Sequence, residues 1–186
     1  MSTVGVDLVP YFAYGTTRQG FAHHRRLAGL LGEPVGRVRT ASAHAVVVPR
    51  RAACSNPGCP YVHRMAALVA GLDPLHVEGD LFLVSNNAIA VFDGLELGSA
   101  GLAGPYVRET LAVETLDGAD AYAAQVYLAR DPARWRALVE LGKAEALATY
   151  PRDLASGEQL KDCCERAPGH PPPHDVVDPL SATPRG

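Results

Sequence analysis

The sequence lacks the features that would place it in several specialised classes of protein. No apolar run approaches the roughly 20 residues that a membrane-spanning helix needs, and the N-terminus has neither the basic start nor the long apolar stretch of a signal peptide. The net charge is only −3, so the chain has no overall positive field that would hold a phosphate backbone. We therefore expect a cytoplasmic protein with no membrane partner and no nucleic-acid partner.

Cysteine is scarce, with four residues among 186. A chain of this length does not need disulfides to form a core, and intracellular proteins seldom contain them. Cys54 and Cys59 are spaced like ligands of a small metal loop, but Cys163 and Cys164 are adjacent and cannot easily both face one tetrahedral ion. Free thiols, a disulfide between the two regions and a structural zinc all stay open, and we assign no metal.

What the sequence does contain is the 47% of hydrophobic residues typical of a globular domain, set in short segments. Asp117-Gly118, between two alternating segments, is typical of a hairpin turn, and Ser85 is a candidate helix N-cap. We expect strands at 9–14, 35–49, 66–70, 77–84, 106–114 and 121–128, and helices at 21–31, 87–95 and 131 to about 147. This order predicts an α+β fold, a small mixed β-barrel with flanking helices.

Two segments depart from this pattern. Residues 50–64 contain prolines, a glycine and a pair of arginines, which favours an insertion or long loop. Residues 167–186 are rich in proline, and we expect a flexible tail there. The predicted organisation is one domain over residues 1–166, with an insertion at 50–64 and a tail at 167–186.

The first chemical signal is the segment Tyr11–Gly20, YFAYGTTRQG, in which an apolar strand breaks at Gly15. A glycine lets the backbone turn sharply and lets a ligand approach the amides, because no β-carbon covers them. The amides that follow Tyr14 can therefore form a cradle for a carboxylate or a carbonyl oxygen. The alternative is a tight strand-to-helix turn in which Thr16 and Thr17 are capping residues.

The second signal is a pair of carboxylates in the segment FDGLEL. Asp93 and Glu96 are three residues apart, so they project to a similar side of a helix. Leu95 and Leu97 flank Glu96, and apolar surroundings would raise its pKa toward the range in which a carboxylate transfers protons. The alternative is a solvated carboxylate at the end of a helix.

In this order, the pieces resemble the gamma-glutamylcyclotransferase-like family. They are the loop Tyr14–Gly20 (YG-[ST]-x-R-x-G), the strand Val77–Val84 (V-x-G-[ED]-L-[FY]-x-V), the D-x-x-E that ends at Glu96, and the Y-x-R that starts at Tyr106. The resemblance covers roughly residues 9–129 and implies the small mixed barrel expected above. The chain departs from the family pattern at Thr16-Thr17, where many relatives have Ser-Leu or Ser-Asn, and after Glu96, where a glycine is usual.

The resemblance implies a lyase that breaks a carbon–nitrogen bond without a cofactor. The α-amine of a γ-glutamyl amide attacks its own side-chain carbonyl, which releases 5-oxoproline and a free amine. Glu96 would be the general acid and base. The residues that would bind this small-molecule γ-glutamyl substrate are Tyr14, Gly15, Thr16, Thr17, Arg18 and Tyr106. The oligomeric state does not follow from the sequence.

The identity of the leaving amine stays open. High usage of Ala, Arg, Gly and Pro is typical of a GC-rich bacterium, and in such organisms some relatives remove a γ-glutamyl protecting group from an antibiotic precursor. Antibiotic biosynthesis therefore stands beside glutathione and γ-glutamyl peptide turnover. The competing classes are a non-enzymatic small-molecule binding module on the same barrel and a cysteine hydrolase. Glu96 argues against the first, since a binder needs no carboxylate beside the loop, and the cysteine positions argue against the second.

Overall fold

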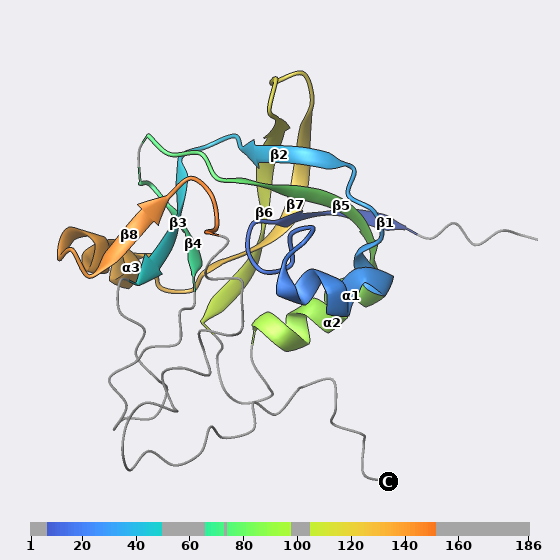
Figure 1. Ribbon diagram of the computed structural model, residues 1–186, viewed down its shortest axis with the longest axis horizontal. Helices are drawn as coiled ribbons and strands as arrows, with labels where there is room; N and C mark the ends of the chain where they lie inside the picture. The colour runs from blue at the N-terminus through green and yellow to red at the C-terminus, as the bar shows by residue number, and fades with distance from the viewer. Residues whose placement is uncertain (1–6, 50–65, 73, 98–104, 152–186) are drawn as a thin grey trace, which may run out of the picture.

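The computed structural model describes residues 7–49, 66–72, 74–97 and 105–151. The strands in these residues are β1 (Leu8–Ala13), β2 (Gly36–Thr40), β3 (His44–Pro49), β4 (Ala67–Ala70), β5 (Glu78–Ser85), β6 (Tyr106–Thr115), β7 (Ala121–Ala129) and β8 (Ala144–Leu147). The helices in these residues are α1 (Ala22–Leu31), α2 (Asn86–Glu96) and α3 (Pro132–Glu140). Helices α1 and α2 lie together beside β1 and β5, and α3 lies near β3 and β8 (Figure 1).

Five of the strands close into a ring. β1 pairs with β5, β5 with β2, β2 with β6, and β6 with β7, and a parallel pairing of Tyr11 with Gln125 joins β7 to β1 again. β4, β3 and β8 extend the sheet outward from β7. The predicted fold class, α+β with a small mixed barrel and flanking helices, is confirmed.

The ring has a hydrophobic core on each side of its wall. Its interior is filled by side chains from all five ring strands, for example Phe12, Val38 and Leu81. The outer face is covered by α1 and α2, where Phe82 packs with Phe92. Because several ring strands are buried on both faces, they read as nearly continuous apolar segments in the sequence.

The wall of the ring is tightest at Gly79. A β-carbon there would lie 2.4 Å from the carbonyl oxygen of Ala13 and 2.5 Å from Cε2 of Phe12. Real β-carbons do not approach a backbone oxygen so closely, so no larger residue fits without moving β1. The glycine of the VEGDLFLV segment is therefore required by packing between β5 and β1.

Two of the local signals read from the sequence are confirmed. Ser85 caps α2, because its Oγ accepts a hydrogen bond from the amide of Ala88 at 3.2 Å. The β6–β7 turn contains Gly118 at a φ of +73°, a backbone conformation that favours glycine. The side chain of Asp117 accepts a hydrogen bond from the amide of Ala119 at 3.1 Å.

The expected single strand over 35–49 is wrong, because the chain breaks at residues 41–43. β2 on one side of the break pairs with β5 and β6, whereas β3 on the other side pairs with β4 and β8. After the break, Nδ1 of the buried His44 lies 3.0 Å from the carbonyl oxygen of Ser42. The two halves thus belong to different parts of the sheet, which an uninterrupted apolar pattern did not reveal.

The expected helix from Asp131 to about Leu147 is correct at its start and wrong at its end. It stops at Glu140, and the chain then turns through Gly142, whose φ is +65°. Ala144–Leu147 forms β8 and pairs with residues Val46–Pro49 of β3. Sheet pairing therefore overrides a segment that is rich in good helix formers.

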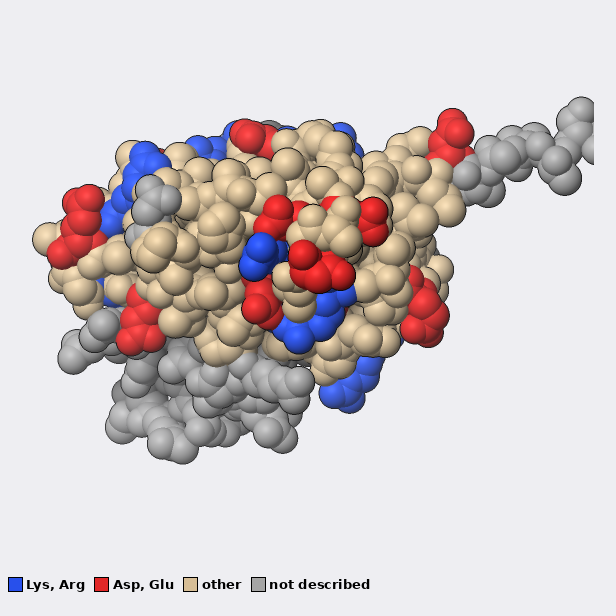
Figure 2. Space-filling view, turned by 90° about the horizontal axis from the view of Figure 1, so that it is seen from above, with Lys and Arg blue, Asp and Glu red and all other residues tan. Residues whose placement is uncertain are grey.

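Charged side chains on the outer face of β2 form cross-strand pairs. Arg37 pairs with Glu78, and Arg39 pairs with Glu114 at 2.7 Å. Figure 2 shows acidic and basic side chains interspersed on the face that it displays. No described helix combines the length and the apolar character needed to cross a membrane.

Several predictions fall on residues outside the described ranges. The insertion at 50–64, the tail at 167–186 and all four cysteines lie there. The domain boundaries and the state of the thiols therefore stay predictions.

Candidate active site

The loop after β1 is held in place by a buried carboxylate from β5. Oδ2 of Asp80 accepts a hydrogen bond from the amide of Gln19 at 2.7 Å and lies 3.8 Å from Nε of Arg18. The Arg18 guanidinium also donates to Oγ1 of Thr149 at 2.9 Å, and it lies over the ring of Phe21 at 5.4 Å. Arg18, which the sequence suggested as a substrate contact, thus links the loop to two other segments.

The start of the loop leaves three backbone amides available. The amide of Arg18 donates to the carbonyl of Gly15 at 3.1 Å, which closes a tight turn. The amides of Gly15, Thr16 and Thr17 donate no hydrogen bond to any part of the chain that the structure describes. Three adjacent donors of this kind are suited to a carboxylate or a developing oxyanion.

The two threonines of the loop contact other residues of the protein, and their hydroxyls do not cap α1. The carbonyl oxygen of Thr16 accepts hydrogen bonds from the amides of His23 and His24, at 3.1 and 3.2 Å. The hydroxyl of Thr16 lies 2.8 Å from Nδ1 of His23. The buried Thr17 has its hydroxyl 3.4 Å from the Tyr11 hydroxyl. Both side chains therefore fix the loop to its neighbours.

Glu96 ends helix α2 and is half-buried. Among the described residues, its carboxylate has neither a hydrogen-bond donor nor a cation as partner. Burial raises its pKa from 4.5 to about 7, because taking a carboxylate out of water disfavours the charged form. Near neutral pH this group is thus able both to accept and to donate a proton.

Tyrosine hydroxyls lie near Glu96 and connect it to the loop. Burial, followed by the charge of Glu96, raises the pKa of Tyr106 above its usual range. Burial is also the main cause of the raised pKa of Tyr14 and Tyr11, and the charge of Glu96 contributes to both. Since Tyr14 precedes Gly15 and Tyr11 contacts Thr17, Glu96 and the open amides belong to one site.

The protons of two of these hydroxyls point away from a ligand and toward the backbone. Tyr106 donates to the carbonyl oxygen of Ala66 at 2.9 Å. Tyr14 donates to the carbonyl oxygen of Tyr127 at 2.9 Å and accepts from the amide of Leu68 at 3.3 Å. What these hydroxyls can offer a ligand is therefore an oxygen lone pair, which accepts hydrogen bonds.

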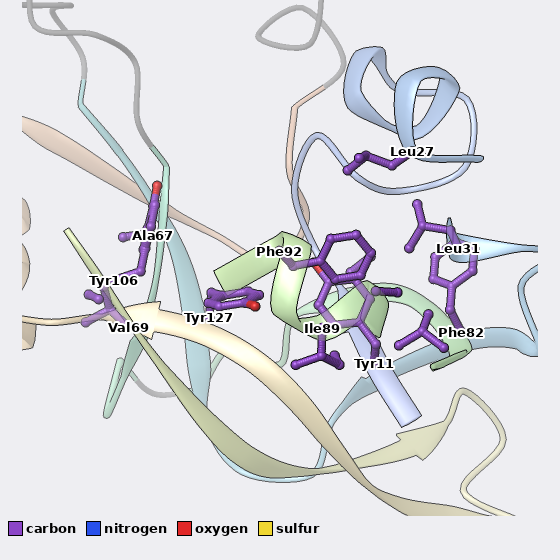
Figure 3. Packing of buried hydrophobic residues seen from close by; sticks show 14 of the residues in the cluster. Tyr11, Leu27, Leu31, Ala67, Val69, Phe82, Ile89, Phe92, Tyr106 and Tyr127 are labelled. Carbon is purple, nitrogen blue, oxygen red and sulfur yellow. The ribbon is translucent and has the colours of Figure 1, made fainter. Parts of the chain in front are cut away.

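Asp93 ties the last turn of α2 to the barrel. Its Oδ1 accepts a hydrogen bond from the hydroxyl of Tyr127 at 2.9 Å, and its Oδ2 lies 3.4 Å from a guanidinium nitrogen of Arg108. Figure 3 shows Tyr127 near Phe92 and Tyr11 in the same core. Asp93 is thus engaged in fixing the helix turn that carries Glu96.

The structure places the predicted site residues around one region, although their roles stay predictions. Tyr14, Gly15, Thr16 and Thr17 form the loop, and Tyr106 and Glu96 lie beside it.

Sequence reasoning missed Asp80, Thr149 and Tyr150, which hold or contact the loop. Asp80 had a signal, since an acidic residue inside an apolar strand requires a buried partner. Tyr150 had none, because it lies 135 positions after Gly15, the loop residue that it contacts.

Comparison with known proteins identifies one family. A sequence model described as "Gamma-glutamyl cyclotransferase, AIG2-like" matches residues 11–145, a range that contains every residue predicted for the site. No curated protein sequence matches the chain.

Solved structures with a similar fold include three proteins of low sequence identity. An AIG2-like protein from Mus musculus has a TM-score of 0.55 and 19% identity, over 77% of this chain and 88% of that chain. YkqA from Bacillus subtilis has a TM-score of 0.44 and 18% identity, over 66% of this chain and 36% of that chain. The human protein loc79017 has a TM-score of 0.48 and 17% identity, over 66% and 67%. The mouse protein thus shares the fold.

Proposed function

Because the chain belongs to the gamma-glutamyl cyclotransferase, AIG2-like family, we propose that it converts a γ-glutamyl amide into 5-oxoproline and a free amine. The family supports cyclotransferase activity, and the proposal adds the roles of the residues. The observation that carries it is Glu96, a half-buried carboxylate with a pKa of about 7 beside a loop with three open amides.

The reaction needs one proton to move between two nitrogens of the substrate. The α-amine nitrogen attacks the side-chain carbonyl carbon, and a five-membered ring forms around a tetrahedral centre. Glu96 takes a proton from the attacking amine and returns it to the leaving nitrogen, after which the original carbon–nitrogen bond breaks. One carboxylate serves both steps because its pKa is close to neutral pH.

The surrounding groups suit the charges of this substrate. The hydroxyl oxygens of Tyr106 and Tyr14 can accept hydrogen bonds from the α-amine, since their own protons are directed to backbone carbonyls. The amides of Gly15, Thr16 and Thr17 can donate to a carboxylate or to the oxyanion. One donor to an oxyanion contributes roughly 3 kcal/mol in comparable sites. Holding the glutamyl chain bent adds more, because effective molarities for oriented ring closure reach about 10⁵ M or above.

The direct test is to incubate the protein with γ-glutamyl amines, γ-glutamyl dipeptides and glutathione, and to measure 5-oxoproline. We expect 5-oxoproline from at least one of them, and a γ-glutamyl antibiotic precursor belongs in the panel because the leaving amine is open. Free glutamate would instead indicate hydrolysis. Binding without turnover across the panel would favour a non-enzymatic binding module.

Variants then test the two halves of the site. Glu96→Gln should abolish turnover and keep substrate binding, whereas Glu140→Gln, at an exposed carboxylate of α3, should change neither. Activity of Glu96→Gln within about tenfold of wild type would refute the assignment.

Gly15→Ala tests the loop without disturbing the fold, because a β-carbon there would meet only the ring of Tyr150, at an ordinary 3.9 Å. We expect weaker substrate binding, since the new methyl group would lie beside the open amides. Gly29→Ala in α1, where a β-carbon meets nothing within 4 Å, is the control. Equal substrate affinity in both variants would remove Gly15 from the site.

A further inference from the structure

Tyr150 contacts the candidate site from a segment that lies outside its two sequence motifs. It follows β8 and is buried, with 6% of its surface exposed. Its ring carbons Cδ2 and Cε2 lie 3.9 and 4.0 Å from the position that a β-carbon of Gly15 would occupy. The ring also packs edge-on against Phe21, with centroids 6.0 Å apart at 73°. An aromatic ring thus stands directly beside the open amides.

The backbone that carries Tyr150 is fixed to the loop by its neighbour. Oγ1 of Thr149 accepts a hydrogen bond from the Arg18 guanidinium at 2.9 Å. Arg18 is in turn close to Asp80, which holds the amide of Gln19. The position of the Tyr150 ring relative to the loop is therefore set by buried polar contacts as well as by packing.

Tyr150 also interacts with the opposite half of the site. Its electrostatic influence reaches the hydroxyl of Tyr106, the residue that lies nearest in this description to the charge of Glu96. Tyr150 is thereby placed between the loop that offers the amides and the region that offers the carboxylate. A glutamyl group that bridges these two regions would have to pass along the ring.

We propose that Tyr150 is a specificity-determining residue whose ring forms a wall against the methylene groups of the bound glutamyl chain. The proposal rests on the proposed function. Ring closure requires the two methylene groups to bend so that the α-amine reaches the side-chain carbonyl, and a rigid apolar wall favours that compact shape. The same wall leaves little room for a substituent on the chain. The substrate class is therefore unbranched γ-glutamyl amides.

The test compares two substrates, a γ-glutamyl amide and the same amide with one methyl group added to its γ-carbon. We expect wild type to prefer the unbranched amide in kcat/KM by about 10-fold to 200-fold, the range that one extra carbon produces in an apolar pocket. In Tyr150→Ala we expect this ratio to fall by about tenfold or more, mainly because turnover of the branched amide rises. A gain of activity is not what general damage to the fold would produce.

Two further variants make the test specific. Tyr150→Phe keeps the ring and should keep the wild-type ratio. Tyr122→Ala truncates a half-buried tyrosine that packs on the same core cluster at the far end of β7, and it should also leave the ratio unchanged. Tyr150→Leu, which keeps more of the buried volume, replaces Tyr150→Ala if circular dichroism shows that the alanine variant does not fold.

The outcomes separate this proposal from the function on which it rests. If wild type makes no 5-oxoproline from the unbranched amide, both proposals fail. If wild type is active but Tyr150→Ala keeps the wild-type ratio, or Tyr122→Ala lowers the ratio equally, only the role of Tyr150 is overturned. Equal wild-type activity on both amides would also overturn it.

Discussion

Replacing Glu96 by glutamine is expected to make the protein more stable as well as inactive. The carboxylate sits in surroundings that raise its pKa from 4.5 to about 7, so the folded state holds the charged form poorly. Glutamine has nearly the same shape and never carries the charge. The variant therefore removes an electrostatic cost that the wild type bears at neutral pH and above.

The size of this effect follows from the two pKa values. Each pKa unit corresponds to about 1.4 kcal/mol, so a rise from 4.5 to about 7 corresponds to about 3 kcal/mol. Because the pKa is raised on folding, the contribution of Glu96 to stability is complete below pH 4.5 and is lost as the pH rises through about 7. The advantage of Glu96→Gln should thus be small near pH 5 and reach about 3 kcal/mol near pH 8.

The assay is denaturant unfolding of wild type and Glu96→Gln at pH 5 and at pH 8. We expect the difference in unfolding free energy between the two proteins to grow by about 2–3 kcal/mol between these pH values. The exposed control Glu140→Gln should show no such growth, because its carboxylate is solvated. A difference that is the same at both pH values would refute the buried, charge-disfavouring environment, and with it the physical basis for Glu96 as a proton carrier.

Two further predictions test the site and the barrel. The rate profile should follow the same group: kcat/KM for a γ-glutamyl amide should fall about tenfold per pH unit below about 7, since Glu96 must be charged to accept a proton, and a flat profile from pH 5 to 7 would contradict this. Gly79→Ala should lower stability by about 3 kcal/mol or prevent folding, because its β-carbon would overlap β1. Gly94→Ala, with nothing within 4 Å, should instead be neutral or stabilising in thermal unfolding.

The elements that could be predicted from the sequence are those specified by local chemistry. Ser85 as an N-cap and the turn at Gly118 depend on residues within a few positions of one another, and both are confirmed. The break between β2 and β3 and the strand β8 depend instead on which distant strands pair, and the segment 35–49 carries no local breaker at residues 41–43. Apolar periodicity cannot show which partner a strand selects.

The site shows the same division, with one difference that bears on its chemistry. Gly15 and Glu96 were found because each belongs to a motif, but the residues that hold the loop come from β5 and from the segment after β8. Asp80 could have been found, because a carboxylate in an apolar strand is costly unless it is paired. Tyr150 could not, since a tyrosine after a short strand has no pattern of its own.

The buried carboxylates of this protein are treated in opposite ways, and the contrast indicates which one moves a proton. Asp80 accepts a hydrogen bond from an amide and lies beside a guanidinium, and Asp93 accepts from Tyr127 and pairs with Arg108. Such partners favour the charged form and fix the side chain in a structural role. Glu96, one helical turn from Asp93, has no such partner among the described residues, and burial raises its pKa instead. A fold that satisfies its neighbouring carboxylates and leaves this one unsatisfied keeps a group whose charge is still to be used, which is what a general acid and base requires.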